Sequence, residues 1–183
     1  MDDSATEIIR PLRRIEYDKL VALGVFAGER VELLEGALIE MSPIGASHQA
    51  AVQRLNRLLT LALSERAAVR CQAAFAALEY SQPEPDFAVV PRADDDTARP
   101  STALLVIEVA DSSLDRDHGK KRRIYASCAV PEYWVVNLPE RCIDVYTRPA
   151  SGAYALVQRY EPDESIHPLA FPDAALAVSD IIE

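Results

Sequence analysis

The sequence predicts an α/β protein in which helices flank a mixed β-sheet, and three features of the 183-residue chain lead to this prediction. A run at residues 103–110, ALLVIEVA, is apolar apart from one glutamate, as in a buried central strand. Residues 47–67 and 115–129 have the apolar spacing of helices. Strands and helices do not alternate regularly, and no glycine-rich phosphate loop is present, which argues against a doubly wound nucleotide-binding fold.

The first part of the chain predicts a helix, a hairpin and a longer helix. Residues 16–24 form a short helix that ends at Gly24. Residues 30–43 have two apolar runs around Glu35 and the following glycine, which is the pattern of a hairpin. The long helix then turns one face toward the core, because apolar positions recur at helical spacing. The residues of this face are His48, Val52, Leu55, Leu59 and Ala62.

The second part of the chain is richer in strands. We expect one or two strands in residues 68–80, and further strands at 85–90, 103–110, 132–138, 141–148 and 154–160. The helix over residues 115–129 separates the two groups of strands. The last residues have short apolar pieces of no clear type.

Length and composition indicate one domain over residues 1–183. No apolar run approaches the ~20 residues of a membrane helix, so we expect no membrane partner. The start of the chain, MDDSATEIIR, lacks the apolar core of a signal peptide. Three cysteines at unrelated spacings are typical of reduced thiols, and we expect a cytoplasmic protein. These cysteines are Cys71, Cys128 and Cys142.

The net charge of −10 argues against a protein that binds nucleic acids tightly and generally, because such affinity depends on lysine and arginine contacts to phosphate. Residues 116–123, RDHGKKRR, are locally basic. They are either a solvated helix face or a basic lip that meets a phosphate backbone weakly. The acidic run Asp94–Asp96 lies in a proline-flanked loop, and we expect it to be solvated and not to bind a metal.

Two carboxylates interrupt apolar runs, and this is costly unless each has a partner. Asp86 begins one predicted strand, and Glu108 lies near the end of the next. Adjacent strands are about 4.8 Å apart, so the two carboxylates can converge if these strands pair. A hard divalent cation such as Mg²⁺ or Mn²⁺ prefers oxygen ligands and commonly takes one or two carboxylates.

A lysine lies on the inward face of the helix that follows. Lys121, Ile124, Tyr125 and Cys128 form the stripe that should face the core. An inward ammonium group needs an anionic partner or a role. Two carboxylates and a lysine together suit metal-dependent phosphodiester hydrolysis. Taken singly, each has an ordinary structural explanation: an ion pair for Glu108, a turn cap for Asp86, and an outward-reaching Lys121.

The segments PEPDFAVV, LLVIEVADSSLDRDHGKKRRIYASCAVPEYWVVNL and VELLEGALIEMSPIGASHQAAVQRLNRLL resemble the Uma2 family, once called a domain of unknown function. Its members resemble restriction endonucleases of the PD-(D/E)XK superfamily. The resemblance covers about residues 12–180 and implies a restriction endonuclease-like fold: a mixed β-sheet core flanked by helices. Residues 1–15 and 166–183 are then peripheral to this single domain.

The resemblance extends to the site residues. Pro85 and Asp86 match the PD element, and Glu108 matches the acidic residue of (D/E)XK. Ala110 stands where that motif has its lysine, and Lys121 matches the place in the following helix to which the family's lysine has moved. Lys120 is the neighbouring candidate, about 100° away in helical phase.

Three further residues are weaker candidates. His48 matches a histidine at the start of the family's long helix, although a histidine on an apolar stripe is more often a core residue. Glu35 could reach the same metal from the hairpin. Asp117 has a simpler explanation as the N-terminal charge of its helix.

These observations predict a Mg²⁺- or Mn²⁺-dependent endonuclease acting on DNA. Asp86 and Glu108 would bind the metal, and Lys121 would assist the attack of water. Cutting both strands needs two active sites, so we expect a homodimer. The charge favours weak or target-restricted DNA binding, with an unidentified targeting partner as one way to supply it. The alternative is a catalytically inactive interaction or assembly module of the same fold.

Overall fold

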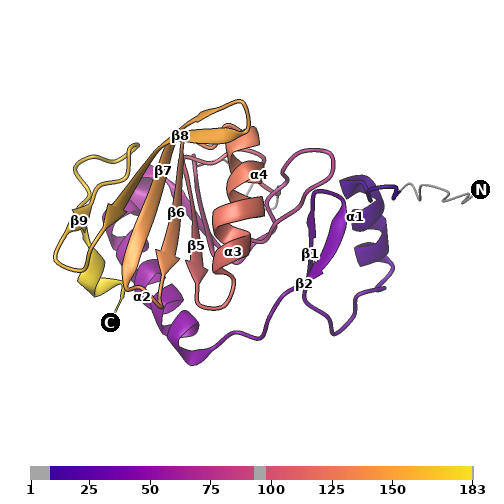
Figure 1. The fold of residues 1–183 in the computed structure, drawn as a ribbon, viewed down its shortest axis with the longest axis horizontal. Coiled ribbons are helices and arrows are strands. Elements are labelled where there is room, and N and C mark those ends of the chain that lie inside the picture. The colour runs from indigo at the N-terminus through magenta and orange to yellow at the C-terminus, as the bar shows by residue number, and fades with distance from the viewer. Residues whose placement is uncertain (1–8, 93–97, 183) are drawn as a thin grey trace, which may run out of the picture.

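The computed structural model describes residues 9–92 and 98–182, so the acidic run Asp94–Asp96 lies outside the described residues (Figure 1). The helices and helical turns are α1 (Arg14–Ala22), α2 (Ala46–Leu63), η1 (Ser64–Arg66), α3 (Leu114–Arg116), η2 (Asp117–Lys121), α4 (Arg122–Ser127) and η3 (Val178–Asp180). The strands are β1 (Val31–Leu34), β2 (Ala37–Glu40), β3 (Ala68–Cys71), β4 (Phe87–Val90), β5 (Leu105–Ala110), β6 (Glu132–Asn137), β7 (Cys142–Ala150), β8 (Ala153–Tyr160), β9 (Ser165–Ile166) and β10 (Leu176–Ala177).

The centre of the fold is a six-stranded sheet of order β3-β4-β5-β6-β7-β8. Strands β5 and β6 are parallel, and the other neighbours are antiparallel. The sheet is therefore mixed, as predicted. The one parallel pair follows from the helical connection over residues 114–127, because two parallel neighbours need a crossover between them.

Helix α2 and the end of the chain cover one face of this sheet (Figure 1). Leu55 and Leu59 on α2 are fully buried, together with Ile107 and Trp134 of the strands. The predicted apolar face of the long helix is thus the face that packs on the sheet. No helix in the described ranges combines the length and apolarity needed to cross a membrane.

Helix α4 covers the opposite face. Ile124 and Tyr125 of α4 pack with Val106, Tyr133 and Val135 of the central strands. Because side chains alternate across a strand, successive residues of β5 pack in turn against the core on the α2 side and the core on the α4 side of the sheet. This explains why the ALLVIEVA run is nearly continuous in apolar residues.

The end of the chain differs from our expectation. We expected residues 166–183 to be peripheral, but the structure places several of their apolar side chains in the core beneath α2. Short turns separate these residues, so they have neither helical nor strand periodicity and the sequence pattern does not reveal their packing. The buried residues are Ile166, Phe171, Ala174, Leu176, Val178, Ile181 and Ile182.

The hairpin β1–β2 lies beside α1, at the other end of the molecule from β9 (Figure 1). Its two-residue turn has positive φ at Glu35 (51°) and Gly36 (81°), as expected for a tight hairpin turn. A side chain at Gly36 would collide with Pro11, at 2.3 Å between the two Cβ positions. Leu33 forms an isolated bridge with Gln82, which fixes β1 near the segment that leads to Asp86.

Candidate active site

A cleft opens where strand β4 begins and strand β5 ends. Phe87 pairs with Ile107, so continuing the register by one residue places Asp86 opposite Glu108. The cleft has a volume of about 150 Å³, enough for a few water molecules or a hydrated cation. Asp86, Glu108 and Lys121 all line it. The predicted pairing of the two strands is therefore confirmed, and it brings these three residues to one cavity.

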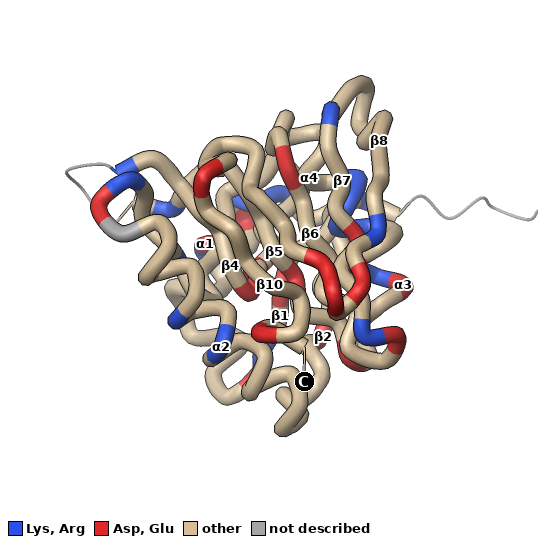
Figure 2. Tube along the Cα trace, turned by 90° about the vertical axis from the view of Figure 1, so that its left-hand side faces the viewer, with Lys and Arg blue, Asp and Glu red and all other residues tan. Residues whose placement is uncertain are grey.

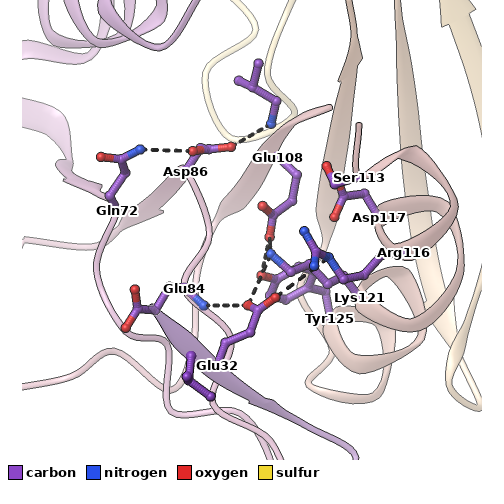
Figure 3. A network of polar contacts seen from close by, with 12 residues as sticks. Glu32, Gln72, Glu84, Asp86, Glu108, Ser113, Arg116, Asp117, Lys121 and Tyr125 are labelled. Atoms are coloured by element: carbon purple, nitrogen blue, oxygen red, sulfur yellow. Dashed lines mark hydrogen bonds and ion pairs between the residues drawn. The ribbon is translucent and has the colours of Figure 1, made fainter. Parts of the chain in front are cut away.

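Asp86 accepts hydrogen bonds from three directions. The backbone N–H of Val109 lies 2.8 Å from Oδ2, and Nε2 of His48 lies 3.1 Å from the same oxygen. The amide of Gln72 donates to Oδ1 at 3.3 Å (Figure 3). Burial alone would raise the pKa of Asp86, but His48 and the Val109 N–H bring this pKa below its ordinary value. Asp86 is consequently held as a carboxylate.

Glu108 is buried and has two donors on one oxygen. Nζ of Lys121 lies 3.0 Å from Oε1, and the Tyr125 hydroxyl donates to Oε1 at 2.7 Å. Burial raises the pKa of Glu108 well above its usual value, although Lys121 acts in the opposite direction. Both of these donors contact Oε1, and Figure 3 shows the carboxyl group between Asp86 and Lys121.

Lys121 is 2% exposed, as its place on the apolar stripe predicted. Its ammonium lies between two carboxylates, 3.0 Å from Glu108 and 3.3 Å from Glu32. Burial would lower the pKa of Lys121, but Glu108, Glu32 and Asp117 together raise it above its usual value. Lys120 does not line the cleft, whereas Lys121 does.

Glu32 belongs to this cluster, and our sequence analysis missed it. It lies in β1 and is fully buried; Oε2 accepts the N–H of Glu84 at 3.2 Å, besides facing Lys121. Oε1 has no hydrogen-bond partner within residues 9–92 and 98–182, and it lies 3.8 Å from Nε of Arg116. The signal was present in the sequence, because VELL places a carboxylate inside an apolar run, as at Asp86 and Glu108.

The hairpin residue that we did select, Glu35, lies elsewhere. It is on the exposed turn and forms an ion pair of 3.3 Å with Arg123. It does not line the cleft. Glu32 lies within β1, whereas Glu35 lies in the turn after this strand, so the two side chains have different surroundings.

His48 and Asp117 both reach the cleft. Nε2 of His48 contacts Asp86, which raises the pKa of His48, while the buried Nδ1 has no partner among the described residues. Asp117 accepts a hydrogen bond from the Ser113 hydroxyl at Oδ2, and its buried Oδ1 has no hydrogen-bond partner in the part of the chain that the structure describes. Burial raises the pKa of Asp117. Asp117 is therefore a buried side chain of the cleft, and not only a charge at the start of a helix.

Acidic side chains outnumber cationic ones in and directly behind this cleft. The acids are Glu32, Glu84, Asp86, Glu108, Asp111 and Asp117, and the cationic residues are Arg30, Arg116 and Lys121, with His48 when protonated. Carboxylates gathered in this way favour the uptake of protons or of a metal cation.

Comparison with known proteins shows the family and the fold class of this chain. Residues 16–179 match the sequence model of the Uma2 family, which is described as "Putative restriction endonuclease". The chain belongs to the Uma2 family. Its fold is similar to the crystal structure of a protein from Anabaena variabilis described as a "putative nuclease belonging to DUF820", with a TM-score of 0.73 and 17% sequence identity. The likeness covers 93% of this chain and 97% of the other. Among curated proteins, none matches the sequence.

The Uma2 assignment and the shared fold confirm the predicted nuclease-like α/β class. In this Uma2 chain, Ala110 is fully buried in the core between β5 and α4. Lys121 approaches Glu108 from the helical segment instead.

Proposed function

We propose that this Uma2 protein is a metal-dependent endonuclease that hydrolyses phosphodiester bonds in DNA. The observation that carries the proposal is the arrangement of Asp86, Glu108 and Lys121: two carboxylates at adjacent strand positions, with a buried ammonium group on one of them, in one cleft. Both the family description and the name of the similar Anabaena protein support nuclease chemistry.

The residues of the cleft fit a divalent cation such as Mg²⁺ or Mn²⁺. Asp86 and Glu108 offer carboxylate oxygens, and acids exceed bases around them. In the described part of the chain, no three acidic, histidine or cysteine side chains stand close enough to form a complete ligand set. Mg²⁺ does not need one, since it usually keeps several waters and binds one or two carboxylates together with substrate phosphate. The bound ion would polarise the phosphate and lower the pKa of a water molecule.

Lys121 is proposed to act on the reacting groups. Its ammonium already sits on Glu108 at 3.0 Å, so a phosphate or water bound beside that carboxylate lies within its reach. There it would orient the attacking water or neutralise the charge that develops on the phosphate. Glu32 holds the other side of the ammonium and fixes its position.

His48 and Tyr125 are positioning residues in this proposal. His48 holds Asp86 at Oδ2, and Tyr125 holds Glu108 at Oε1. Both come from the helices that cover the two faces of the sheet. Each of the helices α2 and α4 therefore orients one of the two carboxylates.

The surface next to the cleft suits a phosphate backbone better than the net charge suggests. Helix α2 has two arginines, Arg54 and Arg57, and no acidic residue along its 18 residues. A second cavity, lined by Arg54 and Arg141, adjoins the cleft at Asp111. Figure 2 shows basic positions along α2, while acidic positions are concentrated on other elements. Nucleic acid would contact this side, and an acidic body elsewhere would limit nonspecific binding.

The test combines metal binding with cleavage. Mg²⁺ and Mn²⁺ are titrated calorimetrically into the wild type, into Asp86→Asn and into Asp163→Asn, an exposed aspartate outside the cleft. The same samples are then incubated with supercoiled plasmid. We expect the wild type and Asp163→Asn to bind metal and to nick the plasmid only when metal is present. Asp86→Asn should lose both properties and still unfold cooperatively.

Absence of metal binding and of nicking in the wild type would contradict the proposal. The protein would then be a non-catalytic module of the same fold. Cleavage of RNA but not of plasmid DNA would keep the chemistry and change the substrate.

A further inference from the structure

Strand β8 forms one edge of the central sheet, and its outer side pairs with no other strand of the described chain. It runs for eight residues, Ala153–Tyr160, and contains one charged residue, Arg159, and no proline or glycine. Natural edge strands are usually short, charged or otherwise protected, because an exposed edge is a template for further pairing. The opposite edge strand, β3, has only four residues and contains Arg70. Strand β8 has less protection.

Both faces of β8 are exposed as well. Leu156 is 44% exposed and Val157 is 55% exposed. Neighbours in a strand point to opposite faces, so each face of the sheet exposes one of these two apolar side chains. Tyr154 is anchored to the body of the protein by its hydroxyl, which donates to the carbonyl of Val130 at 2.9 Å. Figure 2 shows β7 and β8 side by side at one margin of the molecule.

We propose that β8 is a dimerisation edge, at which the β8 strands of two copies of this chain pair antiparallel and join their sheets into one. An antiparallel pair of identical strands has a two-fold axis, and such an interface uses the same patch on both copies. Residues paired in an antiparallel ladder share a face of the sheet, so the axis passes beside a residue that lies opposite its own copy. With the axis beside Leu156, the two copies of Leu156 lie opposite one another, and Val157 of each copy lies opposite Ala155 of the other. The apolar residues at the middle of the strand then cover one another.

The charge pattern of β8 favours a second copy as the occupant. In this register Arg159 of one copy lies opposite Ala153 of the other, so the two arginines do not meet. Arg159 is also already neutralised within its own chain, by Asp144 at 2.9 Å and Glu140 at 2.7 Å. Like charges directly opposite one another would have opposed the pairing.

The proposed pairing is argued from strand β8 alone. Its consequence for the cleavage of DNA rests on the proposed nuclease function. A dimer carries two of the clefts described above, which is what cutting both strands of a duplex requires. The metal titration tests the cleft in a monomer as well as in a dimer, so a failure of the nuclease proposal and a failure of the dimer proposal can be distinguished.

The test measures the mass in solution of the wild type and of two double variants by sedimentation equilibrium at micromolar concentrations. Leu156→Lys with Val157→Lys places like charges opposite one another across the axis. The matched control is Leu61→Lys with Leu169→Lys, at exposed apolar positions away from β8 (71% and 58% exposed). We expect the wild type and the control to have twice the mass of the chain, and the β8 variant to dissociate at least about tenfold more readily.

A single-chain mass for the wild type throughout the concentration range would overturn the proposal. So would a β8 variant that dimerises as strongly as the control. Hydrogen exchange on the wild type provides a second readout, which does not depend on how the variants fold. The amides of residues 154–159 should exchange more slowly at high protein concentration than at low, and equal rates at the two concentrations would also overturn the proposal.

Discussion

Ala110 and Lys121 show that a lysine on a helical segment, and not on the strand, can place its charge at the same carboxylate. Ala110 lies two residues after Glu108 on the same face of β5, where a PD-(D/E)XK motif has its lysine, and here this position is fully buried against α4. Lys121 lies on the layer above and reaches the same carboxylate at 3.0 Å. In the proposed function the lysine is therefore supplied by the helical segment, and the strand position packs as alanine.

We predict that a metal ion restores part of the stability that Lys121→Met loses, but does not restore cleavage. Without its ammonium, Glu108 and Glu32 are buried close together with less compensation, and breaking a buried pair costs about 3–5 kcal/mol. In EDTA the variant should unfold at a clearly lower temperature than the wild type. Mn²⁺ should restore part of this loss, while plasmid cleavage stays reduced by about 10²- to 10³-fold.

The corresponding measurement is thermal unfolding by circular dichroism with EDTA and with Mn²⁺, together with a nicking assay. A variant that cleaves as fast as the wild type would show that Lys121 is only structural. An unfolding temperature that Mn²⁺ does not change would argue against a metal at Glu108.

The hairpin offers a matched pair of substitutions, since Glu32 and Glu35 lie three residues apart and differ in burial. Glu32→Gln removes a charge that contacts Lys121 at 3.3 Å, and we expect cleavage to fall by at least about tenfold, through the turnover rate and not through substrate affinity. Glu35→Gln removes an exposed partner of Arg123 and should leave cleavage unchanged. Steady-state kinetics on both variants decide the matter, and equal effects would contradict the assignment.

At the scale of elements, the helical segment over residues 114–127 is held at its middle by contacts outside the cleft. The turn η2, at Asp117–Lys121, is π-helical, and such turns are rare and often occur at functional sites. His118, next to Asp117, contacts the Tyr146 hydroxyl at 2.6 Å through Nδ1 and lies 3.5 Å from Asp144 through Nε2. These contacts tie the turn to β7, and thereby place Asp117 and Lys121 toward the cleft.

The C-terminal segment yields a prediction about stability. Ile181 is fully buried in the core beneath α2, so Ile181→Ala should destabilise the protein by about 2–5 kcal/mol. Leu169→Ala, at a position that is 58% exposed in the same segment, should change stability by no more than about 0.5 kcal/mol. Urea unfolding followed by fluorescence compares the two, and similar midpoints would show that the segment is not part of the cooperative core.

The elements and the site differed in how far the sequence could predict them. Periodic apolar patterns identified α2, β5 and the strands β6 to β8 closely, because each presents a regular face to a core. Asp86, Glu108 and Lys121 stood out for the same reason, as charges within such patterns. Residues 166–182 were missed because their surroundings depend on contacts between segments distant in sequence, which no local period records. Glu32 was missed although it too is a charge within an apolar run.

At the scale of the whole molecule, the negative charge predicts the order in which the proposed ligands, metal and DNA, bind. The chain has a net charge of −10, and the cleft itself has more acids than bases. A phosphate would meet repulsion there until a cation has been bound. Metal binding should therefore precede DNA binding at the cleft. The basic positions of α2 would then contact the flanking backbone.

The final prediction concerns pH. Burial raises the pKa of Glu108 well above its ordinary value of about 4.3, so the folded state holds this proton more tightly than the unfolded state does. Its contribution to stability is complete below the unfolded pKa and is lost as pH rises through the folded pKa. His48, whose pKa is also raised, acts with the same sign above about pH 6.5. In EDTA, stability should therefore fall between pH 5.5 and pH 8.

A bound metal ion should oppose this fall in stability with rising pH. The ion binds the deprotonated carboxylates, so its affinity rises as the carboxyl groups lose their protons. The difference in unfolding temperature between Mn²⁺ and EDTA should accordingly be larger at pH 8 than at pH 5.5, and Glu108→Gln should show little difference at either pH. The comparison needs buffers matched in ionic strength, since exposed charges are screened by salt. A metal effect in the wild type that is equal at both pH values would mean that Glu108 does not exchange a proton for the metal.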